Sequence, residues 1–210
     1  MNRIVIVFLV FAALVIGVWL LWGGRFEETF GFDATVAWLR ARPGWGGLAG
    51  AGLLVSDLLL PVPGTVVMSA LGYVYGVVAG GLFAVAGSVG AGIAGYGVGR
   101  LMPEKVARRW IGEGDFERSR RLFSGGGGWM IALSRALPVL PEALSCTAGV
   151  VRMPFGRFVV AVACGSVPTG LIFAGIGAAG QQAPGWAMVL SLVIPVLLWL
   201  GARPLLKQAR

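Results

Sequence analysis

Apolar residues fill long, nearly uncharged stretches of this chain, and short polar segments separate them. Residues 4–22 carry no charge, and further apolar stretches cover residues 65–99, 158–179 and 186–202. About 20 residues, at about 1.5 Å per residue, cross the roughly 30 Å hydrocarbon layer of a bilayer. The pattern therefore predicts an all-α polytopic membrane protein, in which the first stretch is a retained transmembrane helix rather than a signal peptide.

Two proline-containing breaks interrupt this apolar pattern, at Pro61-Val62-Pro63-Gly64 and at Pro138-Val139-Leu140-Pro141. Proline lacks an amide donor and restricts the residue before it, and glycine admits positive φ, so no helix is expected to continue through either break. Irregular backbone at membrane depth needs surrounding protein or a water-filled cavity. We therefore predict two re-entrant helical hairpins, over residues 44–76 and 125–151, each followed by a transmembrane helix. For the first, an ordinary loop between two short spans is the alternative.

These elements divide the chain into three parts. Residues 1–43 hold the N-terminal transmembrane helix and an amphipathic segment that is expected in the membrane interface. Residues 44–180 form a core with both hairpins, between which lies a polar loop at residues 100–123. Residues 181–210 supply a C-terminal transmembrane helix and a basic tail.

The core contains an internal repeat, because sliding the sequence by 78 positions aligns its two halves. Internal repeats are typical of transporter folds, whose binding sites form where discontinuous helices of the two halves meet. Whether Ser88, Ser166 and Thr169 hydrogen-bond between helices or line a path stays open. The main aligned residues are Pro63 with Pro141, Ala70 with Ala148, Gly87-Ser88-Val89 with Gly165-Ser166-Val167, Gly97 with Gly175, and Gly99 with Gly177.

The distribution of cations predicts the orientation of the chain. Of the 17 lysines and arginines, thirteen lie at the N-terminus, in the 100–123 loop, at Arg152 and Arg157, and at the C-terminus. Because cationic segments favour the cytoplasmic side, both termini and that loop are expected there. The two hairpins then enter from opposite faces of the membrane, which makes the repeat an inverted one.

Composition excludes most catalytic and metal sites. The chain has no histidine and only two cysteines, so Ser-His-Asp triads, Cys-His pairs and the common zinc sites lack their residues. We predict no metal, no cofactor and no enzymatic activity. The net charge of +8 flanks apolar stretches, which favours anionic lipid headgroups over nucleic acid as the partner. Cys146 and Cys164 are predicted to be small, buried apolar residues.

Three ionisable residues are expected within the membrane: Asp57, Arg135 and Glu142. The 78-residue shift places Asp57 on Arg135, and a lone charge at a helix centre costs about 2.5–3.5 kcal/mol, so opposite charges at equivalent positions indicate one shared cavity. Three hypotheses stay open. They are an ion pair that locks the hairpins, an anion site in which Arg135 binds a headgroup and Asp57 or Glu142 relays protons, and snorkelling to the interface. The planar guanidinium suits phosphate because it donates two hydrogen bonds at once.

The chain also carries several motifs in combination: Leu60-Pro-Val-Pro-Gly-Thr65, Gly95-Tyr-Gly-Val-Gly-Arg100, Arg135-x-x-Pro138 and Met153-x-x-x-x-Phe158. Together they resemble the DedA/VTT superfamily, also called SNARE-associated Golgi proteins. The arrangement Leu137-Pro-Val-Leu-Pro141 is closer to the Tvp-type branch than to the best-known bacterial members.

The resemblance implies an inner-membrane protein with two opposed re-entrant hairpins. Its members are implicated in moving undecaprenyl phosphate or phospholipids, or in scrambling lipids, and some depend on a proton gradient. The resemblance assigns Arg135 to the first arginine of the second hairpin, and Pro61, Pro63 and Gly64 to the tip of the first. The chain departs from the bacterial pattern at three places, where acids or a second arginine are common: Thr65, Gly92 and Pro141-Glu142.

We therefore predict a flippase or scramblase for a phosphate-bearing lipid, such as undecaprenyl phosphate or a phospholipid, in a bacterial inner membrane. The alternatives are a proton- or ion-coupled secondary transporter of a small solute and a non-transporting scaffold for membrane organisation. Membrane lipids are the expected partners, while proton coupling and homo-oligomerisation stay open. The candidate substrate-binding residues are Arg135, Asp57, Glu142, Pro61, Pro63, Gly64, Thr65, Pro138 and Pro141.

Overall fold

The computed structural model describes residues 31–42, 44–58, 62–125, 127–135 and 140–180. Within these ranges all regular secondary structure is helical, as the sequence predicts. The expected transmembrane helices at residues 4–22 and 186–202 lie outside the described residues. The helices are α2 (Phe32–Arg40), α3 (Gly46–Ser56), α4 (Gly64–Leu101), α5 (Glu104–Ile111), α6 (Glu113–Gly125), α7 (Gly128–Ser134), α8 (Leu140–Val150) and α9 (Phe155–Gly180).

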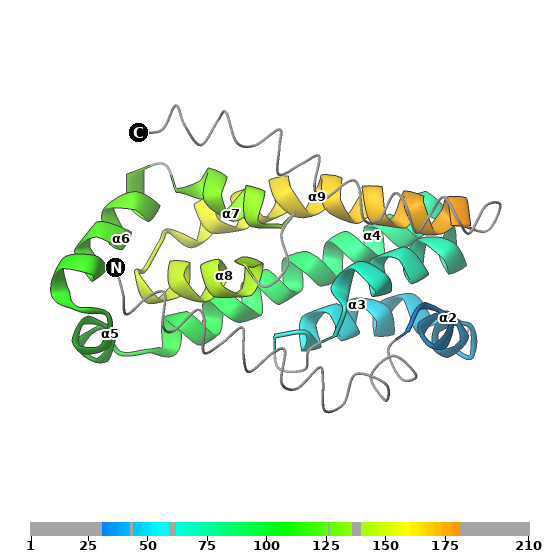
Figure 1. Cartoon of the computed structure of the whole chain (residues 1–210), viewed down its shortest axis with the longest axis horizontal. Coiled ribbons are helices and arrows are strands. Elements are labelled where there is room, and N and C mark those ends of the chain that lie inside the picture. The colour runs from blue at the N-terminus through cyan, green and yellow to red at the C-terminus, as the bar shows by residue number, and fades with distance from the viewer. Residues whose placement is uncertain (1–30, 43, 59–61, 126, 136–139, 181–210) are drawn as a thin grey trace.

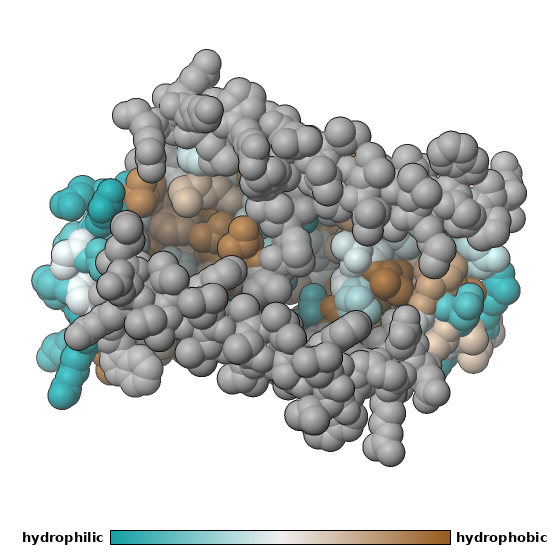
Figure 2. Space-filling view, in the orientation of Figure 1, coloured by the Kyte–Doolittle hydropathy of each residue, from teal (hydrophilic) through white to brown (hydrophobic). Residues whose placement is uncertain are grey.

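Helices α4 and α9 lie side by side and form the centre of the described fold (Figure 1). They are 38 and 26 residues long, and both are long and apolar enough to cross a membrane. They run antiparallel, because the start of α4 packs on the end of α9, at Gly72 and Ala174, while Gly92 near the other end of α4 packs on Val162. Hydrophilic residues gather at the two ends of the visible face and apolar residues lie between them (Figure 2).

Close packing of these helices depends on glycine. A Cβ atom at Gly177 would overlap the carbonyl oxygen of Ser69, and a Cβ atom at Gly99 would overlap the carbonyl oxygen of Cys146. Small residues let helix backbones approach this closely in membranes, where packing rather than the hydrophobic effect drives helix association. Many glycines of the apolar stretches are therefore points of contact between helices.

Equivalent contacts recur at the 78-residue shift. Leu54 packs on Gly87 as Ala132 packs on Gly165, and Val162 packs on Gly92 as Ala84 packs on Gly170. The hydroxyls of the aligned serines, Ser88 and Ser166, are hydrogen-bonded to each other at 2.9 Å. This answers the question that the sequence left open for these serines, whereas Thr169 donates to Gly165 within its own helix.

Two short helices, separated by a non-helical break, precede the long helical segment in each half. In the first half these are α3 and the start of α4, which bends at Gly76, where φ is +79° and ψ is 174°. Only glycine adopts such a conformation readily. In the second half the short helices are α7 and α8, and the chain turns at Arg152, whose φ is +61°, before α9 begins. The helices end at Ser56 and Ser134 and begin again at Gly64 and Leu140, on either side of the predicted breaks, of which residues 59–61 and 136–139 lie outside the described residues. Pro141 was expected within the second break but lies in the first turn of α8.

Residues 100–123 were expected to be a polar loop, and this prediction is wrong. They form most of α5 and α6, whose apolar side chains Ala107, Phe116 and Phe123 are buried in the core. Many charges hid this pattern, because the two helices are short and each buries only a narrow apolar stripe. The amphipathic segment before residue 43 is also helical, as α2, and it buries Val36 and Leu39.

Salt bridges centred on Arg108 hold α5 and α6 together. Its guanidinium Nη2 lies 2.6 Å from Glu104 and 2.7 Å from Glu117, and Nη1 contacts Glu113. The hydrogen bond from Arg108 holds the pKa of the Glu104 carboxyl below its usual range. Because this pKa is lowered in the folded protein, the stabilisation is present above the usual carboxyl pKa and is lost as the pH falls below it. Glu104 also reaches Arg152 at 3.6 Å, so the cluster ties α5 to the turn before α9.

Candidate functional site

The Arg135 guanidinium lies at the centre of the fold, where α7 ends. Its Nη1 donates to the backbone carbonyl of Ser88 in α4, and its Nη2 donates to the hydroxyl of Ser145 in α8, both at 3.2 Å. Its Nε is buried and has no hydrogen-bond partner among the described residues. The partners that hold this cation are therefore neutral, and its hydrogen-bonding capacity is only partly used.

Two residues make room for the guanidinium and orient it. A Cβ atom at Gly92 would overlap Nη2 of Arg135, so only glycine lets the side chain lie flat against α4. Ser145 donates its hydroxyl hydrogen to the carbonyl oxygen of Pro141 at 2.6 Å, which leaves a hydroxyl lone pair to accept from Arg135. Sequence analysis missed Ser145, which has no distinguishing motif. It treated Gly92 as a packing residue that departs from the family pattern.

Asp57 closes the first break. It follows α3, and its Oδ1 accepts the backbone N–H of Val62 at 3.0 Å, while a Cβ atom at Gly64 would lie 3.4 Å from its Oδ2. The carboxylate thus satisfies a backbone amide of the segment that precedes α4, which would otherwise need another acceptor. Asp57 and Arg135 form no ion pair within the described part of the chain, so the structure does not support a direct lock between the hairpins.

Glu142 connects the two other ionisable residues electrostatically. It lies in the first turn of α8, partly buried, and interacts through space with both Asp57 and Arg135. None of these three groups forms a salt bridge with another, as far as the structure describes the chain. The three predicted ionisable residues therefore belong to one electrostatic cluster without neutralising one another by contact.

The structure describes three of the remaining predicted site residues: Pro63, Thr65 and Pro141. Pro63 precedes α4, and its carbonyl oxygen accepts the N–H groups of Val66 and Val67, while Pro141 is buried in the first turn of α8. Pro63 and Thr65 are exposed, and no described contact joins either of them to Arg135. Pro61 and Pro138 lie outside the described residues.

The prediction for the cysteines needs a correction. Cys146 is only partly buried, and Cys164 is exposed on α9. The face of α9 that carries Cys164 also carries Arg157 and Val160, and the described helices leave it uncovered. Apolar surroundings in the sequence therefore did not imply burial, because a membrane helix can expose apolar residues.

Comparison with known proteins identifies the family. A family model described as the VTT domain matches residues 62–179 of the chain. This range includes α4 and α8, the helices that follow the two breaks, as well as Arg135 and Glu142. The chain belongs to the VTT-domain family. Undecaprenyl phosphate transporter A of Bacillus subtilis (strain 168) is 26% identical over 140 residues, which is 60% of this chain and 69% of that protein. No solved structure matches.

The VTT-domain match confirms the family that the motifs indicate, while the Tvp-type branch stays a prediction. Together with the two long apolar helices, it makes the chain a membrane protein. Asp57 precedes the matched range, whereas Arg135 lies within it. Within the described part of this VTT-domain protein, no three His, Cys, Asp or Glu residues are grouped as a metal site would require.

Proposed function

We propose that this VTT-domain protein moves a phosphate-bearing lipid across the membrane and that Arg135 holds the anionic headgroup. The observation that carries the proposal is the partly buried Arg135 guanidinium, which has two neutral hydrogen-bond partners and, among the described residues, a buried Nε without a partner. The relative from Bacillus subtilis is named a transporter of undecaprenyl phosphate, which is a lipid of this class.

The free energy of a buried cation favours such a ligand. A charged arginine in a membrane costs at least about 2.5 kcal/mol, and neutral hydrogen bonds recover only part of this. A phosphate oxygen near Nε would supply the opposite charge, and the planar guanidinium can donate two parallel hydrogen bonds to it. Binding the headgroup would therefore relieve the cost of burying Arg135.

In this proposal the headgroup reaches Arg135 between the two halves of the repeat. We infer that the pairs α3 with the start of α4, and α7 with α8, are re-entrant hairpins that enter from opposite faces of the membrane. The antiparallel packing of α4 and α9, together with the contacts that recur at 78 residues, supports this inverted repeat. Arg135 lies at the end of α7, just before the second break, and donates to the backbone of Ser88, whose hydroxyl is hydrogen-bonded to Ser166. A site at this level can be reached alternately from both sides.

The cations supply the orientation in this proposal. The cluster around Arg108, with Arg152 and Arg157, lies on the cytoplasmic side of a bacterial inner membrane, and both termini lie on that side as well. The expected lipid is undecaprenyl phosphate or an anionic phospholipid.

Reconstitution tests the function. The purified chain in liposomes should expose fluorescent phosphatidylglycerol of the inner leaflet to dithionite, so that quenching passes beyond the roughly half that the outer leaflet contributes. Liposomes without protein provide the baseline, and a fluorescent neutral glycolipid, which has a polar headgroup but no phosphate, tests whether the phosphate is required. If quenching stops at the outer-leaflet fraction with both undecaprenyl phosphate and phospholipid probes, the proposal fails.

Asp57 offers a separate prediction, since its carboxylate accepts the Val62 N–H. Asp57→Asn keeps an acceptor oxygen and should unfold at nearly the temperature of the unchanged chain, whereas Asp57→Ala should lose about 1 kcal/mol, the typical net contribution of one hydrogen bond. Thermal unfolding in detergent measures both. Equal loss in the two variants would show that the charge of Asp57, rather than its hydrogen bond to Val62, matters for the fold.

The same Asp57→Asn variant distinguishes two kinds of transport. If transport depends on pH and the variant loses this dependence while remaining stable, a proton-coupled transporter is favoured over a scramblase. A passive scramblase should move lipid at the same rate in both proteins at every pH.

A further inference from the structure

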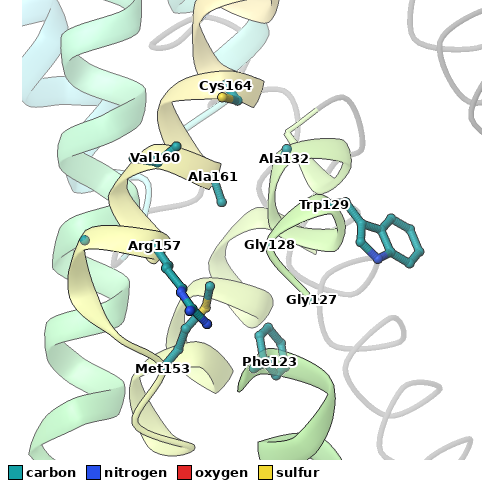
Figure 3. Close-up of a pocket in the computed structure, with 11 residues that line it drawn as sticks. Phe123, Gly127, Gly128, Trp129, Ala132, Met153, Arg157, Val160, Ala161 and Cys164 are labelled. Atoms are coloured by element: carbon teal, nitrogen blue, oxygen red, sulfur yellow. The ribbon is translucent and has the colours of Figure 1, made fainter. Parts of the chain in front are cut away.

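A groove of about 600 Å³ lies between α7 and α9, away from the Arg135 site. Its walls are mostly apolar, and Arg157 is the one charged residue among those that line it. Arg157 and Met153 lie near Phe123 at one end, and Cys164 lies at the other (Figure 3). The volume is within the range of pockets that hold small organic ligands, about 300–1,000 Å³.

In the described part of the first half of the repeat, large side chains stand at the positions equivalent to two residues that line this groove. The 78-residue shift places Phe83 on Ala161 and Leu54 on Ala132. The Phe83 ring packs where a Cβ atom of Gly47 would lie, and it contacts the ring of Tyr75 with centroids 5.6 Å apart. Leu54 is buried at 3% exposure. The second half therefore opens where it carries alanine in place of phenylalanine and of leucine.

The polarity of the groove changes along its length. Arg157 is the third residue of α9, beside the charged α5–α6 end of the fold, and is exposed. Cys164 follows seven residues later, about 10 Å along the helix. Between them the lining is apolar, with Val160 and Ala161 on α9 and Ala132 on α7. A cation at the polar end of an apolar channel complements a molecule with an anionic head and a hydrocarbon tail.

We propose that this groove binds one chain of an anionic membrane lipid, with the headgroup beside Arg157 and the hydrocarbon extending past Ala161 to Cys164. This is a binding site distinct from Arg135 and does not require that the protein transports lipid. Ala132, which lines the groove, lies one helical turn before Arg135, but Arg135 itself is not part of the lining.

The thiol of Cys164 reports occupation of the groove, because it is exposed on the lining. The purified chain in detergent is treated with a maleimide, with and without dioleoyl phosphatidylglycerol, and peptide mass spectrometry separates Cys164 from Cys146. We expect phosphatidylglycerol to slow labelling of Cys164, and phosphatidylcholine to do so about fivefold less effectively, as one cation near a lipid surface predicts. Inorganic phosphate alone should have no effect, since it lacks the tail.

Two variants and a control make the test specific. Ala161→Phe repeats the side chain that fills the first half and should remove protection by lipid. Arg157→Gln should keep protection but remove the preference for phosphatidylglycerol over phosphatidylcholine. Val167→Phe changes an exposed residue of α9 outside the groove and should leave protection unchanged. Because Arg157 is exposed, its variant remains informative if Ala161→Phe fails to fold.

Three results would overturn the proposal. The first is a labelling rate of Cys164 that lipid does not alter, and the second is protection of Ala161→Phe equal to that of the unchanged chain. The third is resistance of Cys164 to labelling in lipid-free detergent. If it then reacts on dilution, a second copy of the chain covers the groove, and if it never reacts, residues 181–210 of the same chain cover it. None of these outcomes depends on a transport measurement, so failure here and failure of the proposed function are distinguishable.

Discussion

Arg135→Ala should reduce lipid movement about 10- to 100-fold in liposomes, which is the effect of losing charge-assisted hydrogen bonds worth about 1.5–3 kcal/mol. Arg135→Lys should retain part of the activity, because it keeps the positive charge but cannot make two parallel hydrogen bonds to phosphate. Rates of dithionite quenching with fluorescent phosphatidylglycerol give both values.

The stability of these variants decides how the loss is interpreted. In the described structure the partly buried Arg135 has neutral hydrogen-bond partners only, so removing its charge should offset the lost hydrogen bonds and leave the unfolding temperature nearly unchanged. Arg109→Ala, at an exposed position of α5, is the matched control and should transport normally. Normal transport by a stable Arg135→Ala protein would remove this residue from the site.

Gly177→Ala should destabilise the protein by about 1–3 kcal/mol, as overpacking a well-packed interior does. The added methyl group would overlap the Ser69 carbonyl oxygen, and backbone cannot move aside as a flexible side chain can. Gly175→Ala, two residues earlier in the same helix, is the control, because its Cβ position meets nothing within 4 Å. It should be neutral or slightly stabilising, since alanine favours a helix over glycine by up to about 1 kcal/mol.

The repeat provides an independent second copy of this comparison. Gly99→Ala would meet the carbonyl of Cys146, while Gly97→Ala meets nothing within 4 Å. In thermal unfolding and protease resistance in detergent, Gly177→Ala should therefore be less stable than Gly175→Ala, and Gly99→Ala less stable than Gly97→Ala. Equal behaviour of Gly177→Ala and Gly175→Ala would show that the close approach of α4 and α9 is not needed for stability.

Much of the central fold follows from local sequence. Uncharged length predicts α4 and α9, and the prolines predict both breaks, because each rule depends on the backbone of one segment. The 78-residue shift identifies Ser88 and Ser166 as equivalent, although only the structure shows that they bond to each other. The repeat alignment also pairs Phe83 with Ala161, a difference from which the groove could have been predicted.

The sequence predicts the ionisable residues of the candidate site but not the hydrogen-bond partners of Arg135. Rarity within apolar sequence singles out Asp57, Arg135 and Glu142. That Arg135 donates to a backbone carbonyl in α4 depends on tertiary packing 47 residues away, which no local pattern encodes. Residues 100–123 escaped recognition for a different reason, since the stabilising charge network around Arg108 also makes the segment resemble a solvated loop.

At the Gly76 bend, the backbone conformation rather than a lack of space limits which residues the chain tolerates. A methyl group there would meet nothing within 4 Å, yet the φ of +79° excludes the L configuration at this position. A chain assembled by chemical ligation with D-alanine at residue 76 would keep the bend and lose the freedom that glycine gives the unfolded chain. The mirror-image residue would thus stabilise a position at which every genetically encoded substitution is strained.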